Sequence, residues 1–286
     1  MVIAAQTAEL APADRKIYAL RDATATVDSL ALGVSSIMSK KLAMGADAIV
    51  LDVKVGGGGV GAARDAARFF AETMVAIGAR CGKRTRALLT RMDEPIGRSV
   101  GDAVELCEAV EALAGRGAAD LNTLCEIVSG HMLALAGVAG GPDEGAHMAR
   151  HALADGRGLA KLRELVEWQG GDPSVVDDPE ALLRGCVRTL VLASDDGYVT
   201  GIDPYRVGAA LRDMKVSAGD RKALCGTLIH RKRADRISAG DALATVLSPE
   251  GLEDEAKQFA AELKACFTTA AQPVAVPDIL LYVIDG

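Results

Sequence analysis

The sequence predicts an α/β fold, built on part of a mixed or parallel sheet with flanking helices and followed by a small C-terminal α+β domain. Half of the 286 residues are hydrophobic, but only 3% are aromatic. The core must therefore consist mainly of Ala, Val, Leu and Ile, as is common where helices cover a parallel sheet. The length exceeds what one small core normally organises, so we expect two compact units.

Helical spacing begins near residue 29, after a segment that starts as an apolar strand entering a turn. Leu32, Ser36 and Lys40 recur four residues apart. Gly45 then supplies a C-terminal stop, which predicts a helix over residues 29–44.

A strand, a helix and a second strand follow. Residues 48–55 are a short apolar, β-branched run that predicts a buried strand, and the run leads into a glycine-rich turn. Helical periodicity over 62–80 and a second apolar run over 84–92 complete a βαβ unit with parallel strands. Further helices are predicted at residues 101–113, 120–136, 144–153 and 159–168.

The pattern changes after a loop rich in Gly, Asp and Pro at residues 169–179, which marks a boundary. Beyond about residue 183, short strands and turns dominate, and we expect a small α+β domain packed behind the first. The strands are predicted at residues 189–193, 197–202, 224–229, 242–247 and 279–284, and the helices at 204–214 and 252–267.

Charge and cysteine usage exclude several classes of function. The formal net charge of −7 argues against nucleic-acid binding, because affinity for the phosphate backbone comes from clustered Lys and Arg. The six cysteines are scattered without a CxxC pair, so we interpret them as small core residues. No window offers the roughly 18 consecutive apolar residues of a membrane span. We therefore expect a cytoplasmic protein that acts on small molecules, with no membrane partner.

One helix face carries the strongest candidate site. Ser36 and Lys40 are four residues apart and so share a face, where they present a hydroxyl and an ammonium together. A pyrimidine dione has two carbonyl oxygens that need donors and an N3–H that needs an acceptor, and Arg21, Ser36 and Lys40 supply those groups. On residue types alone, an Arg–Asp surface pair and a solvated Ser–Lys face remain the commoner explanation.

Residues 14–58 hold Arg21 and a Ser-Lys-Lys run, and two further motifs follow them, Met92-Asp93-Glu94-Pro95-Ile96-Gly97 and Gly101-Asp102-Ala103-Val104-Glu105. Together they resemble the thymidine and pyrimidine-nucleoside phosphorylase family, and the similarity continues to the C-terminus. The resemblance implies that Arg21, Ser36 and Lys40 bind the pyrimidine. It also implies three parts: a remnant of the helical lobe with the base-binding helix (1–45), a partial α/β phosphorylase domain (46–182) and a C-terminal α+β domain (183–286).

The resemblance also assigns an apolar wall to the base pocket. Val60, in the glycine-rich turn, occupies a pocket position that is Phe or Val in relatives. Gly33 stands where the family usually carries a bulky aliphatic residue, so we expect either extra room or a void there. The run of glycines at 57–59 is looser than the usual loop of the family, and ordering it on binding should carry an entropic cost. Its spacing fits neither a P-loop nor a dinucleotide fingerprint.

A potassium site is also implied, as some members of the family have one. Its ligands in this chain would be the backbone carbonyls of Ile96 and Ser99 and the carboxylate of Glu108, a hard-oxygen set that suits an alkali cation. The alternative for Glu108 is a solvated carboxylate on a helix that also carries Glu105 and Glu111.

The implied reaction is phosphorolysis of a pyrimidine nucleoside, a pentosyl transfer that uses phosphate as co-substrate and no organic cofactor. The Lys-His-Ser-Thr-Gly-Gly motif, which holds phosphate and the proton donor in this family, does not occur in the sequence. No catalytic residue is therefore assigned, and the four histidines are expected to be surface or structural residues. We expect the chain alone to be inactive and to act as a homodimer or with a separate N-terminal polypeptide. The alternative is a non-catalytic binding or partner subunit, or a degenerate relative that retains the scaffold.

Overall fold

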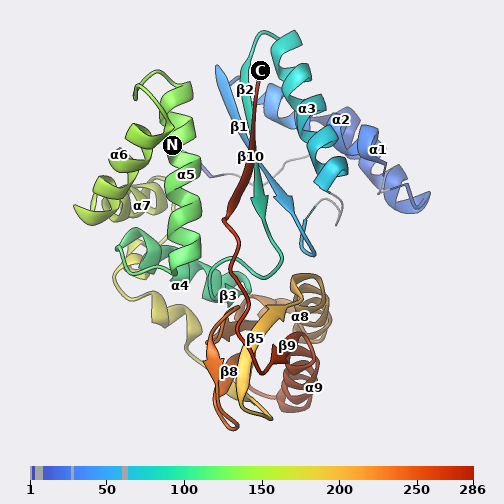
Figure 1. Ribbon diagram of the computed structural model, residues 1–286, viewed down its shortest axis with the longest axis vertical. Helices are drawn as coiled ribbons and strands as arrows, with labels where there is room; N and C mark the ends of the chain where they lie inside the picture. Colours follow the sequence, from blue (N-terminus) through green and yellow to red (C-terminus); the bar gives the residue numbers. More distant parts are fainter. Residues whose placement is uncertain (1, 4–8, 27–28, 60–63) are drawn as a thin grey trace.

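The α/β class is confirmed by the computed structural model, which describes residues 2–3, 9–26, 29–59 and 64–286 (Figure 1). Two helices, α1 (Pro12–Ala23) and α2 (Leu30–Ala43), precede the unit β1 (Ala48–Val55), α3 (Arg64–Arg80) and β2 (Arg84–Arg91). The predicted helix at 29–44 and both predicted strands are therefore present. The apolar strand expected at the start of the chain falls mostly outside the described residues, and α1 was not predicted.

The first sheet is mixed and has the strand order β1-β2-β10. β1 and β2 are parallel, with Ala48 opposite Arg84 and Val55 opposite Arg91. The closing strand β10 (Leu280–Asp285) pairs antiparallel with the other edge of β2. The sequence assigned this strand to the C-terminal unit. It leaves that unit because the backbone N–H and C=O groups of the largely buried β2 need partners on both sides.

Helices cover both faces of this sheet. In Figure 1, α3 lies on one side, with α2 outside it, and α5 (Ala119–Leu135) lies on the other. The residues that close the α2–α3–sheet core are mostly small or aliphatic, as the composition predicts: Val34, Met38, Ile49, Leu51, Val53, Val55, Ala67, Phe70, Ala71, Met74, Val75, Ala87 and Leu89. Among the described residues, no helix is long and apolar enough to cross a membrane.

Four α-helices lie between β2 and β4 in the sequence, namely α4 (Asp102–Leu113), α5, α6 (Pro142–Ala154) and α7 (Arg157–Trp168). α5 and α6 approach closely at a pair of glycines. A β-carbon on Gly130 would lie 2.4 Å from the carbonyl oxygen of Pro142, and one on Gly145 would lie 2.6 Å from the carbonyl oxygen of Gly130. Only glycine permits this contact between the two helix backbones.

Two small sheets and two helices make up the C-terminal part. The helices are α8 (Pro204–Ala218) and α9 (Glu253–Lys264), and the strands are β4 (Cys186–Leu192), β5 (Gly197–Ile202), β6 (Gly226–Ile229), β7 (Arg236–Ile237), β8 (Ala242–Pro249) and β9 (Phe267–Ala270). The sheet orders are β3-β6-β8-β4 and β7-β5-β9, where β3 is Ser99–Val100. The division of the chain at residue 183 stays a prediction, and β3 and β10 both pair across it.

His131 lies in the interface between α5 and the first sheet. The residue is 6% exposed, and its Nδ1 is 3.0 Å from the Arg86 guanidinium. Because arginine supplies only donors, Nδ1 must be an acceptor and the imidazole is neutral. Burial, followed by the charge of Arg86, lowers the pKa of His131 below its ordinary value of 6.5.

The close approach of α5 and α6 predicts opposite effects for two glycine substitutions. Gly130→Ala should lower the free energy of unfolding by about 1–3 kcal/mol, because the new methyl group overpacks the helix contact. Gly208→Ala is the matched control, since that helical glycine is exposed and meets nothing within 4 Å. The control should be neutral or more stable by about 0.4–1 kcal/mol. Urea unfolding measures both, and equal stabilities would contradict the packing.

We also predict that the protein loses stability as the pH falls through the range just below 6.5. In that range the unfolded chain binds a proton at His131 and the folded protein does not, so lower pH favours unfolding. His131→Asn keeps an acceptor toward Arg86 but cannot titrate. Urea unfolding on both sides of pH 6.5 should show a weaker pH dependence for the variant, and an unchanged dependence would rule out this role.

Candidate functional site

Ser36 and Lys40 meet a buried carboxylate where α1 and α2 face each other. The Lys40 ammonium lies 2.7 Å from the Asp14 carboxylate and donates to the Ser36 hydroxyl at 2.9 Å. The Ser36 hydroxyl in turn donates to Asp14 at 3.1 Å. Burial alone would raise the pKa of Asp14, but the hydrogen bonds from Lys40 and Ser36, with the charges of Lys40 and Arg21, lower it. Asp14 is therefore a carboxylate that holds both side chains in place.

Arg21 belongs to the same group. It is buried, and its guanidinium carbon lies 5.7 Å from the centre of the Tyr18 ring. The Lys40 ammonium lies 5.8 Å from the same ring, so Tyr18 contacts both cations through its π face. The structure thus places Arg21, Ser36 and Lys40 around Asp14 and Tyr18. Sequence reasoning missed the last two, although their spacing with Arg21 puts all three on one face of α1.

The expected room beside Gly33 is filled by an aromatic ring. A β-carbon on Gly33 would lie 3.2 Å from the Phe70 ring and 3.9 Å from the Arg21 guanidinium. Phe70 is buried in the core between α3 and α2. Phe70 from α3 therefore occupies the space that a larger side chain at position 33 would take.

The glycine turn after β1 is held by close backbone contacts. Gly56 has a φ of +123°, and a β-carbon there would lie 2.4 Å from the Asp93 carboxylate. A β-carbon on Gly59 would lie 2.1 Å from the carbonyl oxygen of Lys54. The Gly58 N–H donates to the carbonyl of Met92 at 3.0 Å. These glycines are required by the approach of the turn to the ends of β1 and β2. Val60 lies outside the described residues, so its place at the pocket wall stays a prediction.

The three residues of the predicted potassium site line one cavity of about 440 Å³. Ile96 and Ser99 come from the segment after β2, and Glu108 comes from α4. The Glu108 carboxylate accepts the backbone N–H of Arg98 at 2.6 Å and of Ser99 at 3.0 Å. Glu108 is therefore engaged with the loop, and each oxygen keeps a lone pair for a cation. Carbonyl and carboxylate oxygens are hard donors of the kind that alkali cations prefer. The described residues contain no group of three or more His, Cys, Asp or Glu side chains that could hold a metal ion.

A polar triad at the same cavity was missed. The Lys54 ammonium lies 2.6 Å from Asp52 and 3.1 Å from the Thr90 hydroxyl, which also bonds to Asp52. Lys54 lines the cavity at the carboxyl ends of β1 and β2, where open α/β sheets bind ligands. The sequence signal for this triad was the pair Asp52 and Lys54, which alternate with apolar residues in the predicted strand.

The histidines are structural or exposed. His131 points from α5 toward the first sheet, and the His230 ring bonds to the Thr245 hydroxyl at 2.7 Å. Burial, with the charges of Arg98 and Arg231, lowers the pKa of His230. His147 and His151 are exposed on α6.

Comparison with known proteins identifies the family. Residues 1–159 match the family described as "Glycosyl transferase family, a/b domain". The chain belongs to this glycosyl transferase family. Its relatives include a pyrimidine-nucleoside phosphorylase from Geobacillus stearothermophilus, 38% identical over 284 residues, and one from Staphylococcus aureus (strain USA300), 36% identical over 291 residues. The alignments cover 98% and 99% of this chain and 65% and 66% of the relatives. The resemblance inferred from the residues is confirmed, and the chain spans about 65% of the length of these relatives.

The contact between Gly33 and Phe70 predicts a size exchange within this glycosyl transferase domain. Gly33→Ile should lower the free energy of unfolding by about 1–3 kcal/mol through overpacking. Phe70→Ala alone should cost about 3–5 kcal/mol, and less in the Gly33→Ile background, because the new side chain fills part of the space.

A double-mutant cycle measured by urea unfolding tests this exchange. Gly208→Ile serves as the control for helix propensity, since its site is open. Strictly additive effects of the Gly33 and Phe70 substitutions would show that the two residues do not share the space.

Proposed function

We propose that this chain forms the base-binding part of a pyrimidine-nucleoside phosphorylase, which converts a pyrimidine nucleoside and phosphate into the free base and a pentose 1-phosphate. The observation that carries the proposal is the grouping of Arg21, Ser36 and Lys40 around Asp14. The names of the relatives support the same reaction class, a pentosyl transfer.

The cluster supplies the groups that a departing pyrimidine needs. Negative charge develops on the base carbonyls as the glycosidic bond breaks, and the cations of Arg21 and Lys40 stabilise it. The Ser36 hydroxyl donates to Asp14 and accepts from Lys40. A hydroxyl has two acceptor lone pairs, so one remains to accept the N3–H of the base.

The cavity beside the glycine turn supports a role for a monovalent cation. We propose that Ile96, Ser99 and Glu108 bind K⁺, which would supply positive charge where an anionic co-substrate has to be held. Phosphate is the proposed co-substrate, and no organic cofactor is part of the proposal. We propose that phosphate is held by a part outside these 286 residues, because the Lys-His-Ser-Thr-Gly-Gly motif is not among them. The proposed assembly is a homodimer or a complex with a separate N-terminal polypeptide.

The missing motif also favours a second candidate, a non-catalytic binding or partner subunit that retains the scaffold. The two candidates differ in one property. A split enzyme gains turnover when the phosphate-binding part is supplied, whereas a partner subunit does not.

We predict that the chain alone shows no phosphorolysis of thymidine, uridine or deoxyuridine, and that it gains activity with the N-terminal third of a relative. In the reconstituted protein, Lys40→Ala should lower kcat by about 100- to 1000-fold, as expected for the loss of a donor to a developing anion. Lys41→Ala is the matched control, because Lys41 is the exposed neighbour on the same helix.

Two outcomes would contradict the proposal. Turnover by the chain alone that Lys40→Ala abolishes would show that no separate phosphate-binding part is needed. Equal rates for the Lys40→Ala and Lys41→Ala proteins would show that the cluster around Asp14 does not hold the base. Binding of nucleoside without turnover after reconstitution would favour the partner subunit.

A further inference from the structure

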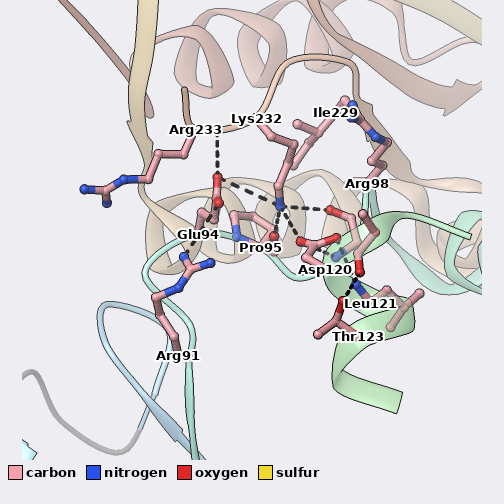
Figure 2. A network of polar contacts seen from close by, with 12 residues as sticks. Arg91, Glu94, Pro95, Arg98, Asp120, Leu121, Thr123, Ile229, Lys232 and Arg233 are labelled. Atoms are coloured by element: carbon pink, nitrogen blue, oxygen red, sulfur yellow. Dashed lines mark hydrogen bonds and ion pairs between the residues drawn. The ribbon is translucent and has the colours of Figure 1, made fainter. Parts of the chain in front are cut away.

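A partly buried lysine from the C-terminal part reaches into the segment that joins β2 to β3. Lys232 lies between β6 and β7, and its side chain is 12% exposed. Figure 2 shows the polar contacts of its ammonium. Its ammonium donates to the backbone carbonyls of Pro95 and Gly97, the second at 3.0 Å. It also pairs with the carboxylates of Asp120 at 3.1 Å and Glu94 at 3.9 Å. Two carbonyl and two carboxylate oxygens therefore surround one ammonium.

We call these four oxygens, from Glu94, Pro95, Gly97 and Asp120, the Lys232 cage. Its two carboxylates are also bonded to groups other than Lys232. Glu94 pairs with Arg91 at 3.7 Å and accepts the backbone N–H of Arg233 at 3.1 Å. Asp120 accepts the backbone N–H of Gly97 at 3.2 Å. The cage is a hard-oxygen set of the kind that binds alkali cations, and the ammonium is a compact single positive charge. Its geometry does not depend on Lys232 alone.

The cage fixes the loop that faces the cavity. Gly97 has a φ of +71° and both of its backbone polar groups are bonded. Its N–H donates to Asp120, and its carbonyl accepts from the Lys232 ammonium. The next residue, Arg98, donates to the carbonyls of Ile229 at 3.2 Å and His230 at 2.7 Å. Residue 96 lies between these attachments and residue 99 directly follows them, and both line the cavity. Their position therefore depends on the C-terminal part of the chain.

We propose that the Lys232 ammonium is a built-in cation that positions residues 94–99, and that its cage becomes a monovalent-cation site when the ammonium is removed. The inference rests on the four oxygens and not on the proposed phosphorolysis. Removing the lysine leaves two carboxylates without their shared countercharge, one of them in the largely buried Glu94. An ammonium or potassium ion of the same charge can then take its place.

The test is thermal unfolding of Lys232→Ala in chloride salts of equal ionic strength. In tetramethylammonium, which is too bulky for the cage, the melting temperature should fall by several degrees relative to the parent protein. Adding NH₄⁺ or K⁺ should raise it selectively and saturably, following the stabilisation expected for a ligand that binds only the folded state. The parent protein keeps any stabilisation that K⁺ gives at the proposed site of Ile96, Ser99 and Glu108, so the cation response of Lys232→Ala is measured relative to that of the parent, which it should exceed.

Lys215→Ala is the matched control, because Lys215 also joins the C-terminal part to an earlier helix. Its ammonium lies 2.8 Å from Asp102, whose side chain is 59% exposed. Lys215→Ala should show the same cation response as the parent protein. Lys232→Gln, a milder change, is measured beside Lys232→Ala in case the latter does not fold without added cation. A response of both Lys232 variants to NH₄⁺ and K⁺ no greater than that of the parent protein, or their failure to fold in every salt, would overturn the proposal.

Discussion

The irregular backbone of residues 92–99 is the constraint on which much of this structure depends. Most of the segment lies in neither helix nor strand, so its N–H and C=O groups need partners from elsewhere. Glu108 accepts the N–H groups of residues 98 and 99, and Asp120 accepts that of Gly97. Lys232 donates to the carbonyls of residues 95 and 97. One short segment thereby joins the first sheet, α4, α5 and the C-terminal part.

The glycine turn depends on the same segment. Gly58 bonds to Met92, and a β-carbon on Gly58 would lie 3.0 Å from both Met92 and Pro204 at the start of α8. The turn is therefore confined between the β2 end and the C-terminal part. The cavity is lined in part by this segment and by Glu108, which binds it. The α1–α2 cluster is organised by a different carboxylate, that of Asp14. The two candidate subsites thus have separate supports.

The parts of the fold that were predicted from the sequence are those fixed by local pattern. The β-branched run at 48–55 forms the strand Ala48–Val55, and the four-residue spacing of Ser36 and Lys40 brings their side chains into contact. The parts that were missed depend on distant partners. Phe70 fills the space beside Gly33 from another helix, and β10 returns to β2 across most of the chain. No local pattern carries either contact.

The central claim is that Arg21, Ser36 and Lys40 hold a pyrimidine ring, and calorimetric titration of the chain with free bases tests it most directly. The account predicts saturable binding of uracil, much weaker binding of N3-methyluracil, which lacks the proton that Ser36 accepts, and loss of uracil binding in Lys40→Ala. Uracil binding that is unaffected by N3 methylation and by removal of the Lys40 ammonium would contradict the claim.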